Sequence, residues 1–98
     1  MDRKLEQVLE FYHRNYRGED FGGELVQENF SSSELGRLKK VYTYGKYAYV
    51  EVQLYERGVL VKVNVTGEVY LFRNKRDAFI FARMRAERYK VLERGFGF

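Results

Sequence analysis

Alternation of apolar and polar side chains constrains the fold of this chain more than any other feature, and it extends from Val41 to Phe72. A period of two residues is that of a β-strand, whose successive side chains point to opposite faces. Three turn signals divide the segment: Gly45-Lys46, Glu56-Arg57 with Gly58, and Thr66-Gly67. The pattern therefore predicts a four-stranded antiparallel meander.

The turns also predict which residues face one another. A two-residue turn at Gly45-Lys46 places Tyr44 opposite Tyr47, and it therefore also pairs Tyr42 with Tyr49 and Val41 with Val50. The second turn predicts these pairs: Tyr55 with Gly58, Leu54 with Val59, Val52 with Val61, Val50 with Val63, and Glu51 with Lys62 as an ion pair. Both registers put aliphatic side chains on one face of the sheet and Tyr or polar side chains on the other.

The register of the fourth strand, Glu68 to Phe72, stays open. A two-residue Thr66-Gly67 loop places Tyr70 and Phe72 on the valine face of the sheet. A three-residue loop places Val69 and Leu71 there instead.

Helical patterns precede the sheet. Residues 2–17 carry one apolar stripe at helical spacing, and residues 18–23 form a loop with two adjacent glycines. Residues 24–30 suggest a short helical turn. Residues 31–40 predict a helix of two or three turns, in which Ser31 and Glu34 have capping-box spacing and Leu35 and Leu38 face the core.

A helix over residues 74–94 follows the sheet, with Asn74 as its N-cap. Its main apolar stripe comprises Ala78, Phe81, Ala82, Tyr89 and Leu92. We interpret the whole as a single α+β domain, residues 1–98: a helical N-terminal part (1–40), an antiparallel sheet (41–72), a basic C-terminal helix (73–94) and a flexible tail (95–98).

Composition excludes several classes of function. With no Cys and one His, His13, the chain lacks thiolate chemistry and the usual ligands of a zinc site. No nucleophile–base pair or phosphate-binding glycine loop is present, so we expect neither an enzyme nor a cofactor. No apolar run is long enough for a membrane span, and the charged N-terminus is unlike a secretory signal, which predicts a cytoplasmic protein. Abundant Glu, Arg and Lys without Cys are typical of thermophile proteins.

Positive charge is concentrated at the C-terminal end. Residues 73–98 hold 8 Lys and Arg against 3 acids, so their net charge of +5 exceeds the net charge of +4 of the whole chain. The cations are Arg73, Lys75, Arg76, Arg83, Arg85, Arg88, Lys90 and Arg94. A localised basic surface favours an anionic partner, most often nucleic acid, although a solvated helix face is the commoner reason for such a run.

A cluster of tyrosines suggests how such a partner would bind. The first hairpin register places Tyr42, Tyr44, Tyr47 and Tyr49 on one face of the sheet, beside Lys62. Aromatic rings stack on unpaired bases while nearby cations contact phosphates, so the pattern predicts a binder of single-stranded DNA or RNA. The predicted site comprises the four tyrosines with Lys62, Arg76, Arg83 and Lys90. Tyrosines also stabilise hairpins by cross-strand pairing, which is the structural alternative.

A second hypothesis is a homo-oligomeric interaction module. Ile80, Met84 and Val91 form a second apolar line on the last helix, which a second copy of the chain would cover in a dimer. The alternative is that this line is only partly exposed, as many surface apolar residues are. Phe96 and Phe98 in the tail would dock on a neighbour.

The order of four strands and a helix, with its Tyr and Arg pattern over Val41 to Leu92, resembles the archaeal single-stranded-DNA-binding proteins of the ThermoDBP type. The resemblance implies binding of single strands and assembly into oligomers, and it assigns a role to no individual residue. The same order of elements is similar to the Whirly class, whose Lys-Gly-rich signature is missing here.

Overall fold

The computed structural model describes the backbone of residues 17–27 and 30–96 and the side chains up to residue 90. Two single turns of 3-10 helix and a short strand come first: η1 (Gly18–Phe21), β1 (Gly23–Val26) and η2 (Ser32–Leu35). The rest of the sheet and one long helix follow: β2 (Leu38–Tyr44), β3 (Val50–Tyr55), β4 (Gly58–Val63), β5 (Glu68–Phe72) and α2 (Lys75–Phe96). The helix predicted over residues 2–17 falls almost entirely outside the described residues.

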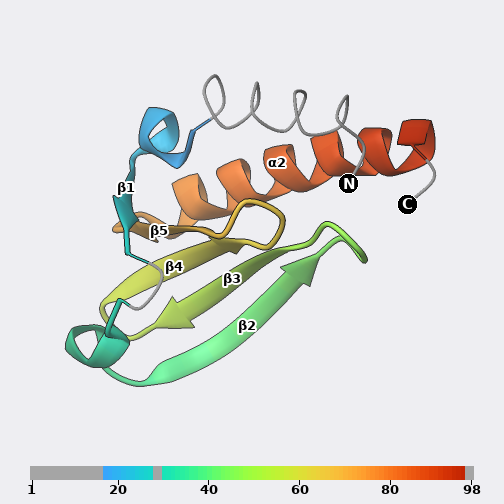
Figure 1. Ribbon diagram of the computed structural model, residues 1–98. Helices are drawn as coiled ribbons and strands as arrows, with labels where there is room; N and C mark the ends of the chain where they lie inside the picture. The colour runs from blue at the N-terminus through green and yellow to red at the C-terminus, as the bar shows by residue number, and fades with distance from the viewer. Residues whose placement is uncertain (1–16, 28–29, 97–98) are drawn as a thin grey trace.

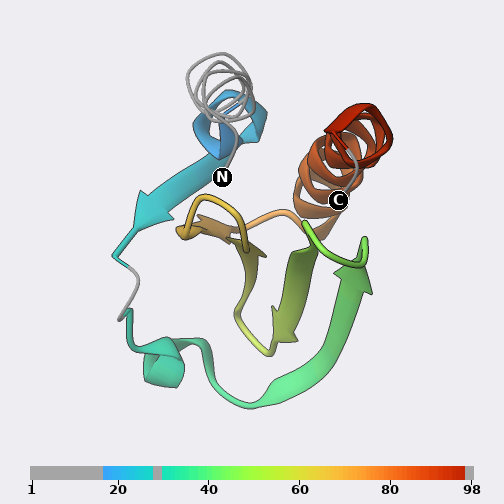
Figure 2. The same ribbon diagram turned by 45° about the vertical axis from the view of Figure 1, so that its right-hand side comes forward.

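The strands form one antiparallel sheet in the order β1-β5-β4-β3-β2, so the sheet has five strands where the sequence predicted four. The α+β class is confirmed. Figure 1 shows α2 lying along one face of the sheet, and Figure 2 shows the sheet curving, with β1 and β2 at its two edges. We call the face under α2 the helix face and the other face the open face.

The central registers agree with prediction. Every pair predicted between β3 and β4 is observed, from Tyr55 with Gly58 to Val50 with Val63. In β5, Tyr70 lies opposite Val61 and Phe72 opposite Val59, so the alternative that puts the two aromatic residues on the valine face is the one adopted.

The register predicted between β2 and β3 is wrong. Tyr44 pairs with Val50 and Tyr42 with Val52, because the chain takes residues 45–49 to turn and not two. The change moves Tyr42 and Tyr44 to the helix face, because a shift by an odd number of residues turns every side chain of a strand over. It moves Val41, now opposite Gln53, to the open face, where 43% of it is exposed.

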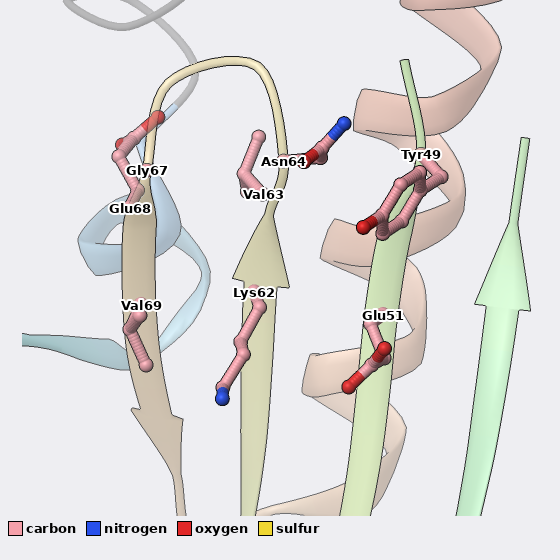
Figure 3. A pocket seen from close by; sticks show the side chains of 8 residues that line it. All are labelled: Tyr49, Glu51, Lys62, Val63, Asn64, Gly67, Glu68 and Val69. Atoms are coloured by element: carbon pink, nitrogen blue, oxygen red, sulfur yellow. The ribbon is translucent and has the colours of Figure 1, made fainter. Parts of the chain in front are cut away.

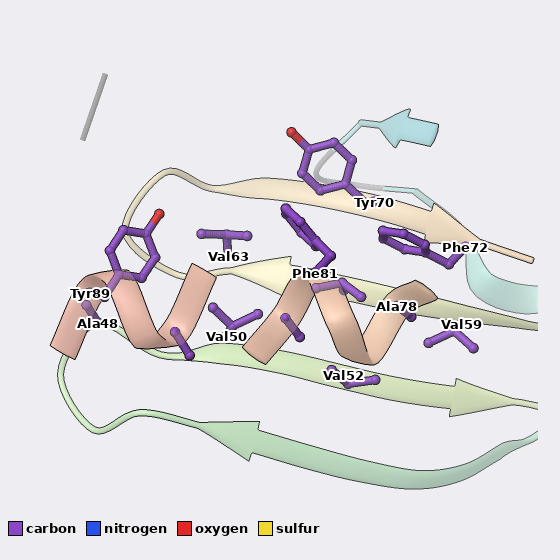
Figure 4. Close-up of a cluster of buried hydrophobic side chains, with 13 residues drawn as sticks. Ala48, Val50, Val52, Val59, Val63, Tyr70, Phe72, Ala78, Phe81 and Tyr89 are labelled. Carbon is purple, nitrogen blue, oxygen red and sulfur yellow. The ribbon is translucent and has the colours of Figure 1, made fainter. Parts of the chain in front are cut away.

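The main core lies between α2 and the helix face (Figure 4). Asn74 caps α2 as predicted, since its Oδ1 accepts hydrogen bonds from the backbone N–H groups of Arg76, at 2.9 Å, and Asp77, at 3.3 Å. The predicted stripe is confirmed for its described members, which are all buried: Ala78, Phe81, Ala82 and Tyr89. Phe81 is the centre of an aromatic cluster, with ring centroids 5.2 Å from Tyr70 and 5.7 Å from Phe72.

The segment before β2 differs most from prediction. Residues 24–26 of the expected helical turn (24–30) belong to strand β1, whose Gly23 lies opposite Phe72 of β5. A Cβ atom at Gly23 would come within 2.7 Å of the Phe72 ring, so the close approach of β1 requires glycine. The helix predicted over residues 31–40 is reduced to the single turn η2, because Leu38, Lys39 and Lys40 continue into β2.

Leu35 of η2 is buried as predicted and closes a second, smaller core on the open face with Leu60, Val69 and Leu71. Leu38 is 44% exposed and does not face the core. Ser31 makes no capping hydrogen bond with its side chain; its Oγ lies 3.0 Å from that of Ser33. The helical stop expected at Arg94 is also wrong, since α2 continues to Phe96.

Candidate functional site

Residues 45–49, which we call the hairpin tip, join β2 to β3 at one end of the sheet. Gly45 begins the turn with φ of 94°, a left-handed conformation that glycine adopts without strain. Asn64 at the end of β4 holds the tip, because its Nδ2 donates to the carbonyl of Tyr47 at 3.3 Å and its backbone N–H donates to that of Tyr49 at 3.1 Å. Tyr47 is therefore presented on an anchored loop, with 59% of it exposed and Lys46 Nζ 5.6 Å from its ring centroid.

On one side of the tip, the open face carries a hollow of about 310 Å³ (Figure 3). Tyr49, the last residue of the tip, and Glu51 of β3 line it together with Lys62 and Val69 from the neighbouring strands. Glu51 and Lys62 face each other in register, but the described residues contain no ion pair between them within 4.0 Å. Glu51 instead accepts a hydrogen bond from Gln53 Nε2 at 2.5 Å, so the predicted ion pair is not formed and Lys62 stays exposed.

On the other side of the tip, a smaller hollow of about 140 Å³ lies between the hairpin and α2. Tyr44, Arg83 and Lys90 line it, together with Glu87. Arg83 and Lys90 are seven residues apart, which is two helical turns, so they lie on the same side of α2. We call this the helix-side hollow and that of Figure 3 the open-face hollow.

The predicted platform of four tyrosines is not formed. Tyr42 packs edge-on against Phe79 of α2, with ring centroids 5.2 Å apart, and Lys40 Nζ lies 4.9 Å from the Tyr42 centroid. Both the contact with α2 and the contact with Lys40 leave little of this ring for a ligand. Tyr44 also contacts Phe79, at 6.4 Å, but it borders the helix-side hollow. The hairpin tip thus divides the remaining three rings: Tyr44 on one side, Tyr49 on the other and Tyr47 between them.

Arg76 belongs to the same side of α2 as Arg83 and Lys90, and all three are exposed. This row of cations is the part of the predicted site that the helix assembles as the sequence suggested. Arg85 is different: it was counted with the basic surface, yet none of its side chain is exposed. Its position in the series Phe81, Arg85, Tyr89, at intervals of four, was the signal that places it on the buried stripe.

Arg85 belongs to a buried polar network that the sequence did not reveal. Its Nη1 donates to Glu68 Oε1 at 3.1 Å and to the hydroxyl of Tyr89 at 3.2 Å. Glu68 also accepts hydrogen bonds from Thr66 Oγ1, at 2.6 Å, and from the Tyr70 hydroxyl. The network joins the start of β5 to the middle of α2.

The environment of this network raises the pKa of two tyrosines. Burial, followed by the hydrogen bond to Glu68 and its negative charge, raises the pKa of Tyr70 to about 12. Burial also raises the pKa of Tyr89, although the Arg85 charge opposes the shift. Both hydroxyls therefore stay protonated to higher pH than an exposed tyrosine, as their hydrogen bonds in the network require.

The second apolar line predicted on α2 is divided by the fold. Ile80 is 46% exposed, whereas Met84 is half-buried and packs against the main core. The side chains of Val91 and Phe96, and all of Phe98, lie outside the described residues. Within the described part of the chain, no group of three or more His, Cys, Asp or Glu side chains is placed to hold a metal ion, and no helix is long and apolar enough to cross a membrane. His13 lies outside that part.

Comparison of the chain with protein-family models, with curated proteins and with solved structures gives no significant match. The structure itself defines the class: an α+β protein whose five-stranded antiparallel sheet is covered by a helix on one face and in part by η2 on the other.

Proposed function

We propose that this protein is a non-enzymatic, cytoplasmic binder of single-stranded nucleic acid, and that the strand crosses the hairpin tip. One observation carries the proposal: the tip has a hollow on each side, and each hollow combines a tyrosine with at least one cationic side chain. Tyr44 lies with Arg83 and Lys90 in the helix-side hollow, and Tyr49 lies with Lys62 in the open-face hollow.

The chemistry of the surface suits a single strand. An unpaired base offers a flat π-face, which stacks on an exposed aromatic ring whatever the base, while the backbone phosphates meet Lys and Arg. Tyr47 is the most accessible of these rings and stands between the two hollows. In a duplex the π-faces are already stacked on one another, so the tyrosines would contribute little to binding it.

The row of Arg76, Arg83 and Lys90 extends the surface along α2. Successive members are about 10 Å apart, because seven residues of helix rise that far. Such a row follows the phosphates of an extended strand, and its contribution is electrostatic, so we expect salt to weaken binding. The resemblance in element order to the archaeal ThermoDBP-type proteins is consistent with the same class of ligand.

The electrostatic part is tested by fluorescence anisotropy of a labelled oligonucleotide at several salt concentrations. Single-stranded binding loses about 0.7 in the slope of log affinity against log salt for each phosphate contact removed. We expect that loss for Arg83→Gln. Arg37→Gln, which removes one exposed arginine at the other end of the sheet, is the matched control and should leave the slope unchanged. Equal slopes for the two variants would contradict the role of α2.

The stacking part is tested at Tyr47, whose exposure makes substitutions there compatible with folding. Tyr47→Phe keeps a ring and should keep the affinity for a single strand. Tyr47→Leu removes the π-face and should lose about 1–3 kcal/mol, which is about 5- to 150-fold in Kd. If the Tyr47→Leu and Tyr47→Phe variants bind the single strand equally well, stacking at the tip is refuted. Binding of duplex as tight as that of the single strand refutes it as well.

A second candidate, a homodimeric interaction module, is favoured by exposed apolar side chains in two places, on edge strand β2 and on α2. Leu38 and Val41 of β2 are 44% and 43% exposed, and Ile80 of α2 is 46% exposed. An unpaired strand edge with apolar side chains is a template for pairing with another chain. Ile80→Glu and Val41→Lys test it by light scattering. If α2 or β2 forms the interface, the variant in that element reduces the molar mass to that of a monomer, and an unchanged mass for both variants refutes the candidate.

A further inference from the structure

The end of the sheet opposite the hairpin tip carries a third hollow, of about 460 Å³, which the nucleic-acid proposal does not use. Four cationic residues line it and come from three places in the chain: Lys39 in β2, Arg57 in the turn between β3 and β4, and Arg73 and Lys75 on either side of Asn74, the N-cap of α2. Its volume is in the range of sites for small ligands.

The cations of this hollow, which we call the basic hollow, outnumber its acids four to one. The one acid, Glu56, is directed elsewhere, since its Oε1 accepts a hydrogen bond from the backbone N–H of Arg37 at 2.8 Å. Asp77, the acid in the first turn of α2, has its carboxylate beside Gly22, next to η1. Among the described residues, none of the four cations has a carboxylate oxygen within 4.0 Å.

The hollow is built before any ligand arrives. Arg57 Nε donates to the carbonyl of Glu34 at 3.0 Å, and the Arg57 backbone N–H donates to that of Leu35 at 2.9 Å. The guanidinium is therefore held at the end of η2, with Nη1 beside Gly36, and its terminal nitrogens remain hydrogen-bond donors. The two cations at the start of α2 stand where the helix dipole adds to the positive potential.

We propose that the basic hollow binds a phosphate group carrying at least two negative charges. Four like charges around one space repel each other, and a multiply charged anion relieves that repulsion better than a single carboxylate does. Two of the four are arginines, whose planar guanidinium matches two phosphate oxygens at once. The phosphate comes either from the end of a nucleic-acid strand or from a small phosphorylated compound. The proposal stands without the nucleic-acid proposal, because it uses other residues.

Calorimetric titration of the full chain with inorganic pyrophosphate tests the site. We expect saturable binding of one pyrophosphate per chain. Arg73→Gln/Lys75→Gln should weaken it at least roughly tenfold, because two charged hydrogen-bond donors are lost. Lys46→Gln/Arg88→Gln makes the same change in net charge at exposed positions outside the basic hollow and should weaken it less than about twofold. Absence of saturable binding, or equal weakening by the two double variants, overturns the proposal.

Oligonucleotides with and without a terminal phosphate identify the source. If the phosphate belongs to a strand, the phosphorylated oligonucleotide binds more tightly than the unphosphorylated one, and Arg73→Gln/Lys75→Gln abolishes only that gain. Pyrophosphate binding with no such gain supports a small phosphorylated ligand. If pyrophosphate binds while no oligonucleotide does, the basic hollow is supported and the nucleic-acid proposal alone fails.

Discussion

The buried pair of Glu68 and Arg85 allows a quantitative prediction about stability. None of the Arg85 side chain and 3% of that of Glu68 is exposed, so Arg85→Met removes one charge of a buried ion pair. Removing one partner of a buried pair costs about 3–5 kcal/mol, because the remaining charge keeps its desolvation penalty. A domain of this size has a free energy of unfolding of roughly 5–15 kcal/mol. The variant should therefore lose a large fraction of its stability.

Urea unfolding followed by circular dichroism measures the loss, with Arg83→Met, an exposed position on the same helix, as the control expected within about 0.5 kcal/mol of the native chain. The double variant Glu68→Gln/Arg85→Met removes both charges and keeps an acceptor for Thr66 and Tyr70. Its cost should fall short of the sum of the single costs by about 0.5–3 kcal/mol, as coupled neighbours do. Additive costs, or an Arg85→Met variant as stable as the control, would refute the coupling.

Alkaline pH tests the raised pKa of Tyr70: the folded state holds this proton more tightly than the unfolded state, so its contribution to stability is complete below pH 10 and lost as pH rises to about 12. Tyrosinate absorbance should show a late-titrating group that Tyr70→Phe removes, and an unaltered late phase in that variant would contradict the assignment. Substitutions of two turn glycines should differ in cost, because a Cβ at Gly45 would lie 2.7 Å from the carbonyl oxygen of Ala48 while one at Gly67 meets nothing within 4 Å. Both have positive φ, so thermal unfolding should show Gly67→Ala destabilised by about 1 kcal/mol and Gly45→Ala by clearly more; equal melting temperatures would disprove the steric argument.

The sequence by itself determined the elements whose geometry is local. The turn at residues 56–57 is bounded by Tyr55 and Gly58, and from it alone the pairing of β3 with β4 follows residue by residue. Asn74 begins α2 because its side chain satisfies amides two and three residues further on, and the buried side of the helix follows from a period of 3.6 residues. These features depend on neighbours along the chain, which are visible in the sequence.

Tertiary structure decided the rest, including most of the candidate site. A loop over residues 45–49 in place of a two-residue turn moves each side chain of β2 to the opposite face of the sheet. In that register Tyr42 and Tyr44 pack against Phe79, which is more than thirty residues away from them along the chain. β1 pairs with β5, which lies far from it along the chain. Arginine is a residue type usually found at the surface. Arg85 is buried beside Glu68, a residue of another element that carries the opposite charge. Contacts between distant segments select among local alternatives of similar free energy, so no local pattern reveals which one is adopted.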